Sequence, residues 1–191
     1  MKNKIYEPLT TPYESKMNKA LPWSDYPRPQ FRRSSYICLN GEWDFAVSGE
    51  EEPVQYSDKI LVPFPPESRL SGIGRAIPKK SYLHYKRRFS LPEGFNEGRV
   101  ILHFGACDTL CRVFINGKEV AYHEGGYLPF SADITEALAD GENLLYVKAY
   151  DANSHKYPYG KQRVRRGGMW YTPVSGIWQT VWLESVKAEL I

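Results

Sequence analysis

The sequence predicts an all-β fold, a two-layer β-sandwich, on three observations. Aromatic residues are abundant, with 5 Trp, 14 Tyr and 8 Phe, and they occur together with 14 Pro and 15 Gly. This mixture is typical of strands and structured loops rather than helices. Apolar residues recur at a period of two in several short segments, as strands with one buried face require. Asn116-Gly117 joins two of these segments, and an Asn-Gly pair in that context is the strongest short-range hairpin signal.

The first region in chain order is a leader, residues 1–35. Pro12, Pro22, Pro27 and Pro29 are spaced through it, and proline interrupts both helices and strand ladders. We therefore expect the leader to lie extended over the body of the protein. Residues 36–191 are expected to form one sandwich domain, since 191 residues suit a single well-packed core.

About eight strands are predicted after the leader. Trp43, Phe45 and Val47 alternate with Glu42, Asp44 and Ala46, so the strand 42–47 turns one face inward. The segment 100–104 is apolar on both faces apart from its histidine, which predicts a strand covered on both sides. The other predicted strands are 60–64, 83–89, 113–115, 120–122, 143–151 and 178–186. Their number and spacing are typical of a sandwich or jelly roll.

Helix is nearly absent from the pattern. Asp133 followed by Glu136 has the form of a capping box, which predicts one or two helical turns over 133–138. Two connections, 67–81 and 152–177, are too long to serve only as links and are candidates for function.

Composition and charge exclude several classes of protein. A net charge of +3 without a basic stripe disfavours nucleic acid and anionic membranes as partners. No apolar run approaches the length of a membrane-spanning helix. Three cysteines make no secreted disulfide framework, and residues 1–10 lack the apolar core of a signal peptide. We therefore expect a cytoplasmic location.

The familiar catalytic and metal signatures are missing. No G-x-S-x-G nucleophile elbow is present. The glycines of Gly72-Ile73-Gly74 lack the third glycine and the strand–helix context of a dinucleotide fingerprint. Cys107 and Cys111 are four apart, but nothing completes a zinc site around them, and the four histidines are scattered. The sequence predicts no metal and no cofactor.

The second long connection has the residue types of a sugar site. Aromatic faces cover the C–H patches of a pyranose, and carboxylate, amide and guanidinium groups hydrogen-bond its hydroxyls. The candidates are Trp170 and Tyr171 with Asp151, Asn153, Arg165 and Arg166. Packing of the same aromatic residues in the core or in an interface explains them equally well.

Longer motifs carry a resemblance to a known family. In chain order they are Leu39-Asn-Gly-Glu-Trp-Asp-Phe45, Val62-Pro-Phe64 with Glu67-Ser68, Leu70-Ser-Gly-Ile-Gly74, Tyr85-Lys-Arg-Arg-Phe89, Leu102-His-Phe-Gly-Ala106, Val113-Phe-Ile-Asn-Gly117, Gly125-Gly-Tyr-Leu-Pro-Phe130, Asp133-Ile-Thr135, 143–151 and 168–184. From about residue 36 to the end, the chain resembles the N-terminal sugar-binding domain of the family 2 glycoside hydrolases, the β-galactosidase and β-glucuronidase group.

The resemblance implies a galactose-binding-domain-like jelly roll. It also implies that an immunoglobulin-like sandwich and a TIM barrel follow in a parent chain, which can be a homo-oligomer. The paired glutamates of a retaining glycosidase sit on such a barrel, so this chain is assigned no catalytic residue and is expected to be inactive alone.

Loops of such a domain help to form the pocket for the glycone, here of β-galactoside or β-glucuronide type. The substrate-binding residues that the resemblance and the residue types select are Ser71, Asp151, Arg165, Arg166, Trp170 and Tyr171. Relatives often carry an Asp shortly before the Ser-Gly-Ile segment, whereas the corresponding positions here hold Gly168, Met169 or Trp170. No such carboxylate contact or cation is therefore carried over. Two other functions stay open: an autonomous carbohydrate-binding module, and a purely structural or oligomer-forming sandwich.

Overall fold

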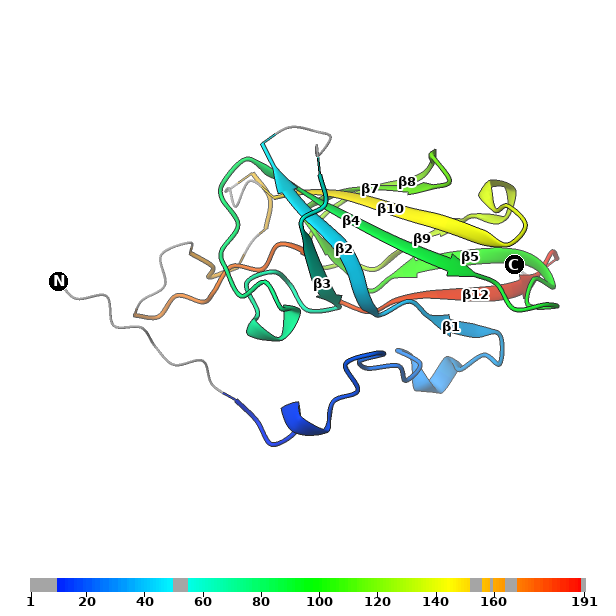
Figure 1. Ribbon diagram of the computed structural model, residues 1–191, viewed down its shortest axis with the longest axis horizontal. Helices are drawn as coiled ribbons and strands as arrows, with labels where there is room; N and C mark the ends of the chain where they lie inside the picture. The colour runs from blue at the N-terminus through cyan, green and yellow to red at the C-terminus, as the bar shows by residue number, and fades with distance from the viewer. Residues whose placement is uncertain (1–9, 50–54, 152–155, 159, 164–167, 190–191) are drawn as a thin grey trace.

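The protein is a two-layer antiparallel β-sandwich, seen in a computed structural model that describes residues 10–49, 55–151, 156–158, 160–163 and 168–189 (Figure 1). The strands are β1 (Tyr36–Cys38), β2 (Gly41–Ser48), β3 (Asp58–Val62), β4 (Ser81–Ser90), β5 (Gly98–Phe104), β6 (Cys107–Asp108), β7 (Leu110–Ile115), β8 (Lys118–Glu124), β9 (Phe130–Asp133), β10 (Glu142–Asp151), β11 (Gly176–Ile177) and β12 (Val181–Lys187). Four single-turn 3₁₀ helices accompany them: η1 (Glu14–Lys16), η2 (Pro29–Phe31), η3 (Arg69–Ser71) and η4 (Thr135–Ala137).

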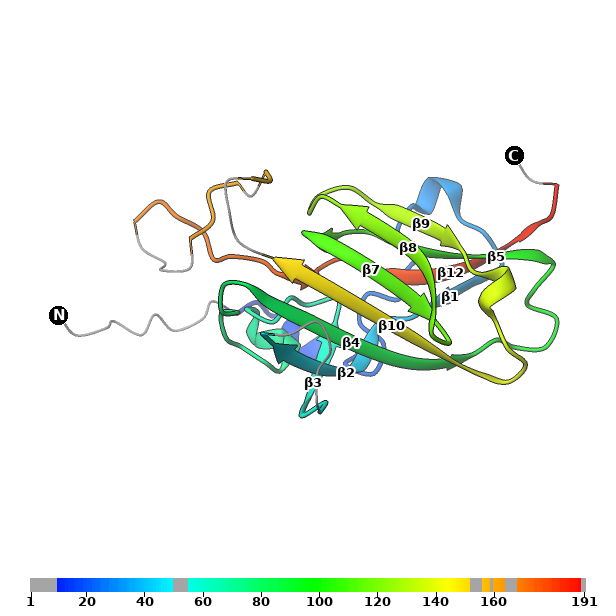
Figure 2. The ribbon, with the colours of Figure 1, turned by 90° about the horizontal axis from the view of Figure 1, so that it is seen from above.

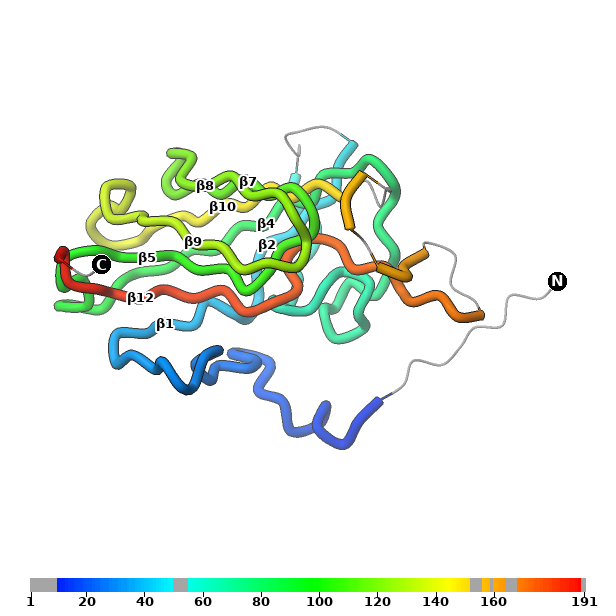
Figure 3. The backbone as a smooth tube through the Cα atoms, turned by 180° about the vertical axis from the view of Figure 1, so that it is seen from behind, coloured from blue at the N-terminus to red at the C-terminus, as the bar shows by residue number. Residues whose placement is uncertain are grey.

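One layer is a six-stranded sheet in the order β3-β2-β4-β10-β7-β8, which faces the viewer in Figure 2. The other is a four-stranded sheet in the order β1-β12-β5-β9, which is nearer in the reverse view of Figure 3. A two-stranded pair, β6 with β11, lies at one end of the sandwich. The predicted all-β jelly-roll sandwich is confirmed.

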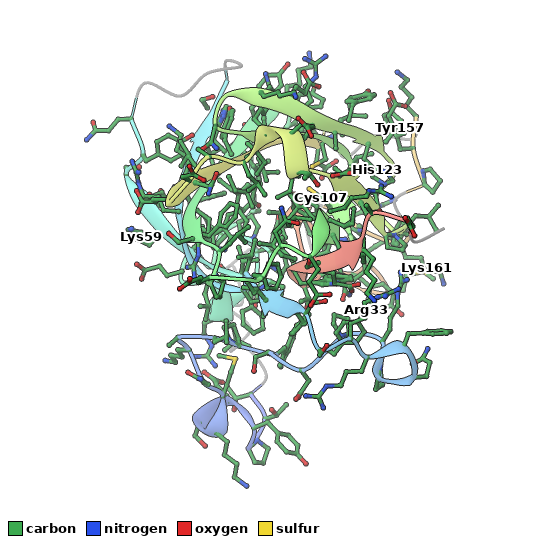
Figure 4. All side chains as sticks on the ribbon, turned by 90° about the vertical axis from the view of Figure 1, so that its right-hand side faces the viewer. Arg33, Lys59, Cys107, His123, Tyr157 and Lys161 are labelled. Carbon is green, nitrogen blue, oxygen red and sulfur yellow. The ribbon has the colours of Figure 1, made fainter. Side chains whose placement is uncertain are left out.

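The core lies between the layers because alternate residues of both sheets turn inward. Trp43, Phe45, Leu83 and Tyr85 come from the six-stranded sheet and are at most 1% exposed. The opposite sheet contributes its own row of fully buried residues: Val100, Leu102, Phe104, Val181 and Leu183. Figure 4 shows Cys107 near the centre of the molecule, with Lys59 and Lys161 at opposite edges.

The predicted strands are all present, with changes at their ends. The strand expected from Trp178 begins only at Val181, because Trp178 lies in the approach to β12, where its indole Nε1 donates to the Gly126 carbonyl oxygen at 2.8 Å. Of the one or two helical turns expected over 133–138, one is present as the 3₁₀ turn η4, but without the predicted capping box. Asp133 is the last residue of β9, and its carboxylate accepts a hydrogen bond from the backbone N–H of Thr135 at 3.0 Å. This local bond takes the place of the bond that a capping box would make to residue 136, and only the single turn η4 forms.

The described part of the leader packs along the four-stranded sheet, below β1 in Figure 1. Its main anchor is Glu184 of β12, which is 5% exposed. Arg33 Nε lies 3.0 Å from the Glu184 carboxylate, and the Tyr26 hydroxyl and the Trp182 indole N–H donate to the same group. A buried carboxylate needs such partners, so the leader is an integral part of the sandwich surface.

The scattered cysteines and histidines have structural environments where they are described. Cys107 and Cys111 are buried free thiols, and His84 lies between the Ser48 and Tyr146 hydroxyls at 3.0 and 2.8 Å. His103 stacks on Trp182 with ring centroids 4.8 Å apart. Among the described residues, no helix is long and apolar enough to span a membrane.

Trp43→Ala is expected to destabilise the fold strongly. Trp43 is 1% exposed and its indole N–H donates to the Leu39 carbonyl oxygen at 2.9 Å, so truncation leaves a large cavity and costs about 3–5 kcal/mol. Thermal or denaturant unfolding measures the loss. The matched control is Trp23→Ala in the leader, where the indole is 59% exposed. Equal losses in the two variants would contradict the assignment of Trp43 to the core.

Candidate functional site

Three carboxyl groups meet at the end of the sandwich where β10 stops. Asp151 closes β10, Glu67 lies in the connection from β3 to β4, and Asp108 closes β6. The Ser175 hydroxyl donates to Glu67 Oε1 at 2.8 Å and is 3.2 Å from Asp151 Oδ2. The Thr109 hydroxyl bonds the Asp108 carboxyl and lies 3.5 Å from Asp151 Oδ1. We call this series, from Glu67 through Ser175, Asp151 and Thr109 to Asp108, the carboxyl–hydroxyl chain.

Two carboxyl groups of the carboxyl–hydroxyl chain, those of Glu67 and Asp108, have raised pKa values. Burial is the main cause that raises the pKa of Glu67 to about 7 and of Asp108 to about 6, and the nearby Asp151 carboxylate raises both further. Ser175 and Thr109 each have one hydroxyl hydrogen but face two carboxyl groups. A carboxyl that keeps its proton supplies the missing donor and avoids charge in a poorly solvated place.

The segment Ser175-Gly176-Ile177 is held beside the carboxyl–hydroxyl chain by hydrogen bonds of its backbone. The Ser175 backbone N–H donates to Glu67 Oε2 at 3.2 Å, and the Ile177 N–H donates to the Tyr85 hydroxyl oxygen at 3.3 Å. Gly176 between them has φ of 68°, and a Cβ there would lie 2.1 Å from the Tyr85 hydroxyl oxygen. Both the backbone conformation and the space therefore require glycine.

A second loop closes over Asp108. A Cβ on Gly126, in the connection from β8 to β9, would lie 2.5 Å from Asp108 Cγ. This close approach places the Gly126 carbonyl oxygen where the Trp178 indole can donate to it. Gly126 thus allows the backbone to lie directly over a buried carboxyl group.

The long connection after β10 is held by Gln162. Its side-chain oxygen accepts from the Val174 N–H at 2.7 Å, and its Nε2 donates to the Tyr127 hydroxyl at 3.2 Å. Gln162 also forms a parallel bridge with Tyr171, where the Tyr171 N–H donates to the Lys161 carbonyl oxygen at 2.8 Å. These bonds fold the described part of the connection back on itself next to the carboxyl–hydroxyl chain.

The predicted substrate-binding residues fall into different environments. Tyr171 is 66% exposed, and the Trp170 ring carries the Arg163 guanidinium 3.8 Å from its centroid. Asp151 is buried in the carboxyl–hydroxyl chain. Ser71 is 1% exposed, and its hydroxyl donates to the Ser68 carbonyl oxygen at 2.7 Å while accepting from the Ile73 N–H. Arg165 and Arg166, with Asn153, lie outside the described residues.

Sequence reasoning missed Glu67, Thr109, Gln162 and Ser175 as parts of this end. Glu67 and Ser175 occurred in the family motifs but are 108 positions apart, so no local pattern could pair them. A polar residue inside a long, aromatic loop was the only available signal for Gln162.

The arrangement suits binding better than chemistry. The carboxyl groups point at hydroxyls within the protein, whereas Tyr127, Leu128, Met169 and Tyr171 are 47–67% exposed on the surrounding loops. No group of three or more His, Cys, Asp or Glu side chains in the described ranges could hold a metal ion. This end therefore offers exposed aromatic and apolar surface on a rigid base of hydrogen bonds, which is what carbohydrate recognition uses.

Exposed aromatic side chains on loops at one end of a β-sandwich are features that carbohydrate-binding domains use, and comparison with known proteins gives the family. The family model described as "Glycosyl hydrolases family 2, sugar binding domain" matches residues 73–186. The chain belongs to this family, as its motifs predicted.

Curated relatives carry the names of glycosidases. A beta-galactosidase of Thermoanaerobacter pseudethanolicus is 36% identical over 103 residues, covering 52% of this chain and 13% of the relative. A beta-glucuronidase of Felis catus is 31% identical over 121 residues, covering 54% of this chain and 18% of the relative. The matched part of this chain thus spans less than a fifth of the length of these two enzymes.

Solved structures share the fold. A beta-glucuronidase from an uncultured Clostridium species superposes with a TM-score of 0.58 at 23% identity, covering 80% of this chain and 29% of its own. A beta-D-mannosidase from Dictyoglomus thermophilum gives 0.59 at 21% identity, covering 80% and 23%.

The contribution of Glu67 to the free energy of unfolding is expected to fall as pH rises from about 4.5 to 7. Glu67, whose pKa burial raises to about 7, binds a proton in the folded state that the unfolded chain releases at lower pH, so the folded state loses stability across that window. Glu67→Gln should remove a pH-dependent contribution on the order of 2 kcal/mol.

The measurement is thermal unfolding of wild type and Glu67→Gln at about pH 5 and about pH 8. The matched control, Glu136→Gln, changes an exposed carboxylate on η4 and should track the wild type. The same pH response in wild type and Glu67→Gln would show that Glu67 holds no proton in the folded protein.

Proposed function

We propose that this chain is the N-terminal sugar-binding domain of a retaining β-glycosidase of family 2, and that its loop end helps to shape the glycone pocket of a catalytic barrel elsewhere in the parent polypeptide. Membership of the sugar-binding family supports the domain assignment. The names of the relatives support hydrolysis of β-galactosides or β-glucuronides as the parent's reaction.

The single observation that carries the proposal is the exposed surface of the loop end. Four large apolar or aromatic side chains, Tyr127, Leu128, Met169 and Tyr171, stand out on two loops that are themselves fixed by Gln162 and Trp178. Rigid loops with exposed apolar side chains are typical of surfaces that another polypeptide or a ligand covers. An immunoglobulin-like segment and a TIM barrel are the proposed covering domains, and we propose that the parent can form a homo-oligomer.

A cytoplasmic location is part of the same proposal. Cys38, Cys107 and Cys111 are free thiols in the structure, and free thiols are favoured in a reducing compartment.

The carboxyl groups of Glu67 and Asp151 do not have the arrangement of a catalytic pair. Retaining glycosidases need two carboxyl groups about 5 Å apart with the glycosidic bond between them. The space between Glu67 and Asp151 is instead occupied by the Ser175 hydroxyl, which contacts both groups. A sugar cannot enter there without breaking the hydrogen bonds that hold Ser175.

The chain alone is therefore expected not to hydrolyse nitrophenyl β-galactoside, β-glucuronide or β-mannoside. The measurement is release of nitrophenol by the purified chain, with Glu67→Gln as the control for trace contaminants. Turnover that Glu67→Gln abolishes would place a reaction centre in this chain and would contradict the proposal.

Expression of the gene's full reading frame tests the parent's activity. A β-glycosidase whose KM rises in the Trp170→Ala variant, with a smaller effect on kcat, is the expected result, because Trp170 contributes to binding and not to chemistry. Tyr13→Ala, which removes an exposed aromatic ring of the leader, is the matched control. A reading frame that encodes no further domain, or a protein without glycosidase activity, would contradict the proposal and favour an autonomous binding module.

Binding of galactose or glucuronate to the chain alone is expected to be weak, about 1 mM or weaker. A half-formed pocket leaves most of a monosaccharide in contact with water, and tight small-ligand sites bury most of the ligand surface. Isothermal titration calorimetry measures the affinity. Micromolar affinity that Trp170→Ala removes would show that the loop end is a complete site.

A further inference from the structure

The connection after β10 concentrates positive charge. Between Asp151 and Glu184 the sequence holds five Lys or Arg residues and no Asp or Glu, whereas the whole chain of 191 residues has a net charge of +3. Aromatic residues, among them Tyr157 and Trp170, lie between and after these cations. A basic segment with interleaved aromatic rings suits a ligand that is both anionic and ring-shaped.

The backbone around Arg163 is held in place, in the orange segment at the left of Figure 1. The Arg163 N–H donates to the Tyr171 carbonyl oxygen at 3.1 Å, and the Tyr171 N–H donates to the Lys161 carbonyl oxygen at 2.8 Å. Gln162, between the two cations, forms the parallel bridge with Tyr171, and its side chain is buried. Lys161 and Arg163 are exposed on either side of it, so both positive charges face solvent from a fixed stretch of backbone.

The side chain of Arg163 is fixed as well. Its guanidinium carbon lies 3.8 Å from the centroid of the Trp170 ring, which is a close cation–π contact. The N–H groups of a guanidinium lie in its plane, so a ring against one face leaves them able to donate. A guanidinium whose plane is already oriented loses less entropy when it binds a carboxylate through two parallel hydrogen bonds.

Arg163 has no carboxylate partner among the described residues, and neither has Lys161. Most other described arginines form ion pairs with Asp or Glu, namely Arg33, Arg69, Arg75, Arg88, Arg99 and Arg112. The carboxyl groups of the carboxyl–hydroxyl chain bond the Ser175 and Thr109 hydroxyls instead. The guanidinium of Arg163 is therefore oriented by an aromatic ring and available to an anionic ligand.

We propose that Arg163 is a specificity-determining residue of the loop end and binds the carboxylate of a uronic acid unit. Tyr171, 66% exposed and bonded to the Arg163 backbone, supplies an apolar face for the sugar ring, and Lys161 adds a second positive charge. Charge then selects acidic sugars over neutral sugars of the same shape. This assignment rests on the proposed function, because it names the class of sugar that the loop end helps to bind.

A single-stranded nucleic acid also combines negative charge with flat rings. The match to a sugar-binding family favours a saccharide, and so does the absence of a basic stripe in the rest of the sequence. An oligothymidylate therefore serves as a control ligand.

The test is an NMR titration of the whole chain with the methyl β-glycosides of glucuronate and galacturonate, compared with those of glucose and galactose. At least one acidic glycoside is expected to shift the backbone amides of residues 161–163 and 170–171 and to bind at about 1–10 mM. Its affinity should exceed that of its neutral counterpart about tenfold. Added salt should weaken the binding of the acidic glycoside and leave that of the neutral one unchanged.

Arg163→Gln, a change of an exposed side chain, should lower the affinity for the acidic glycoside about tenfold and leave the neutral one unaffected. The matched control is Arg32→Gln, which removes the same charge from an exposed residue of the leader that also has no ion pair with a described carboxylate. It should bind as the wild type does.

The assignment would be overturned if neither acidic glycoside bound, if the neutral glycosides bound equally well, or if Arg163→Gln kept wild-type affinity. Acetate or oligothymidylate binding as tightly as the acidic glycosides would also overturn it, because the loop end would then recognise negative charge without a sugar.

The parent enzyme separates this assignment from the proposed function. In Arg163→Gln, the ratio of kcat/KM for nitrophenyl β-glucuronide to that for nitrophenyl β-galactoside should fall about tenfold. An active glycosidase with an unchanged ratio would contradict the role of Arg163 alone. A parent without glycosidase activity would contradict the proposed function, whereas the titration, which needs only this chain, would still decide whether Arg163 binds a uronic acid.

Discussion

The single hydroxyl hydrogen of Ser175 is the constraint on which the loop end depends. It lies between the carboxyl groups of Glu67 and Asp151, and the Thr109 hydroxyl repeats the arrangement with Asp151 and Asp108. One hydroxyl hydrogen cannot be donated to two carboxylates at once, and burial raises the pKa of Glu67 to about 7 and that of Asp108 to about 6, which favours the protonated form of these two groups. Separating these groups would leave a buried polar or charged group without a hydrogen-bond partner, which costs free energy. The hydrogen bonds therefore hold together segments that are far apart in the sequence.

These hydrogen bonds explain how loops can hold the exposed side chains of this end in fixed positions. Loops are mobile unless their backbone groups find partners. Here Glu67 bonds the segment before β11, Trp178 bonds the β8–β9 connection, and Gln162 bonds both Val174 and Tyr127. The two sheets supply the rigid base, and a small set of buried polar groups carries that rigidity into the loops. An aromatic side chain held in this way loses less entropy when it contacts a ligand or another domain.

Local patterns predicted the sheets well and the loop end poorly, for a physical reason. Trp43 and Phe45 obey the period of two because one face of β2 is buried along its length, and Asn116-Gly117 turns the chain between β7 and β8. Strands of two residues, such as β6 and β11, are too short to show any period. The pairing of Glu67 with Ser175 spans 108 positions, so only the folded topology reveals it. The capping-box pattern at Asp133 failed because its carboxylate found a nearer partner, the Thr135 N–H.

The pleat of β10 gives the domain two chemically different surfaces from adjacent residues. Tyr150 and Lys148 turn outward beside Tyr82 and Arg112, while Ala149 and Val147 between and before them are fully buried in the core. A shift of one residue in the pairing of β10 with β4 would carry Lys148 into the core and the apolar residues into water. Burial of the inner-face side chains therefore fixes the ten register pairs between these two strands. The same register fixes the positions of the side chains on the outer face. The position of Lys148 opposite Arg112 on the outer face is thus a consequence of core packing, because the register that buries Val147 and Ala149 also places these two side chains side by side.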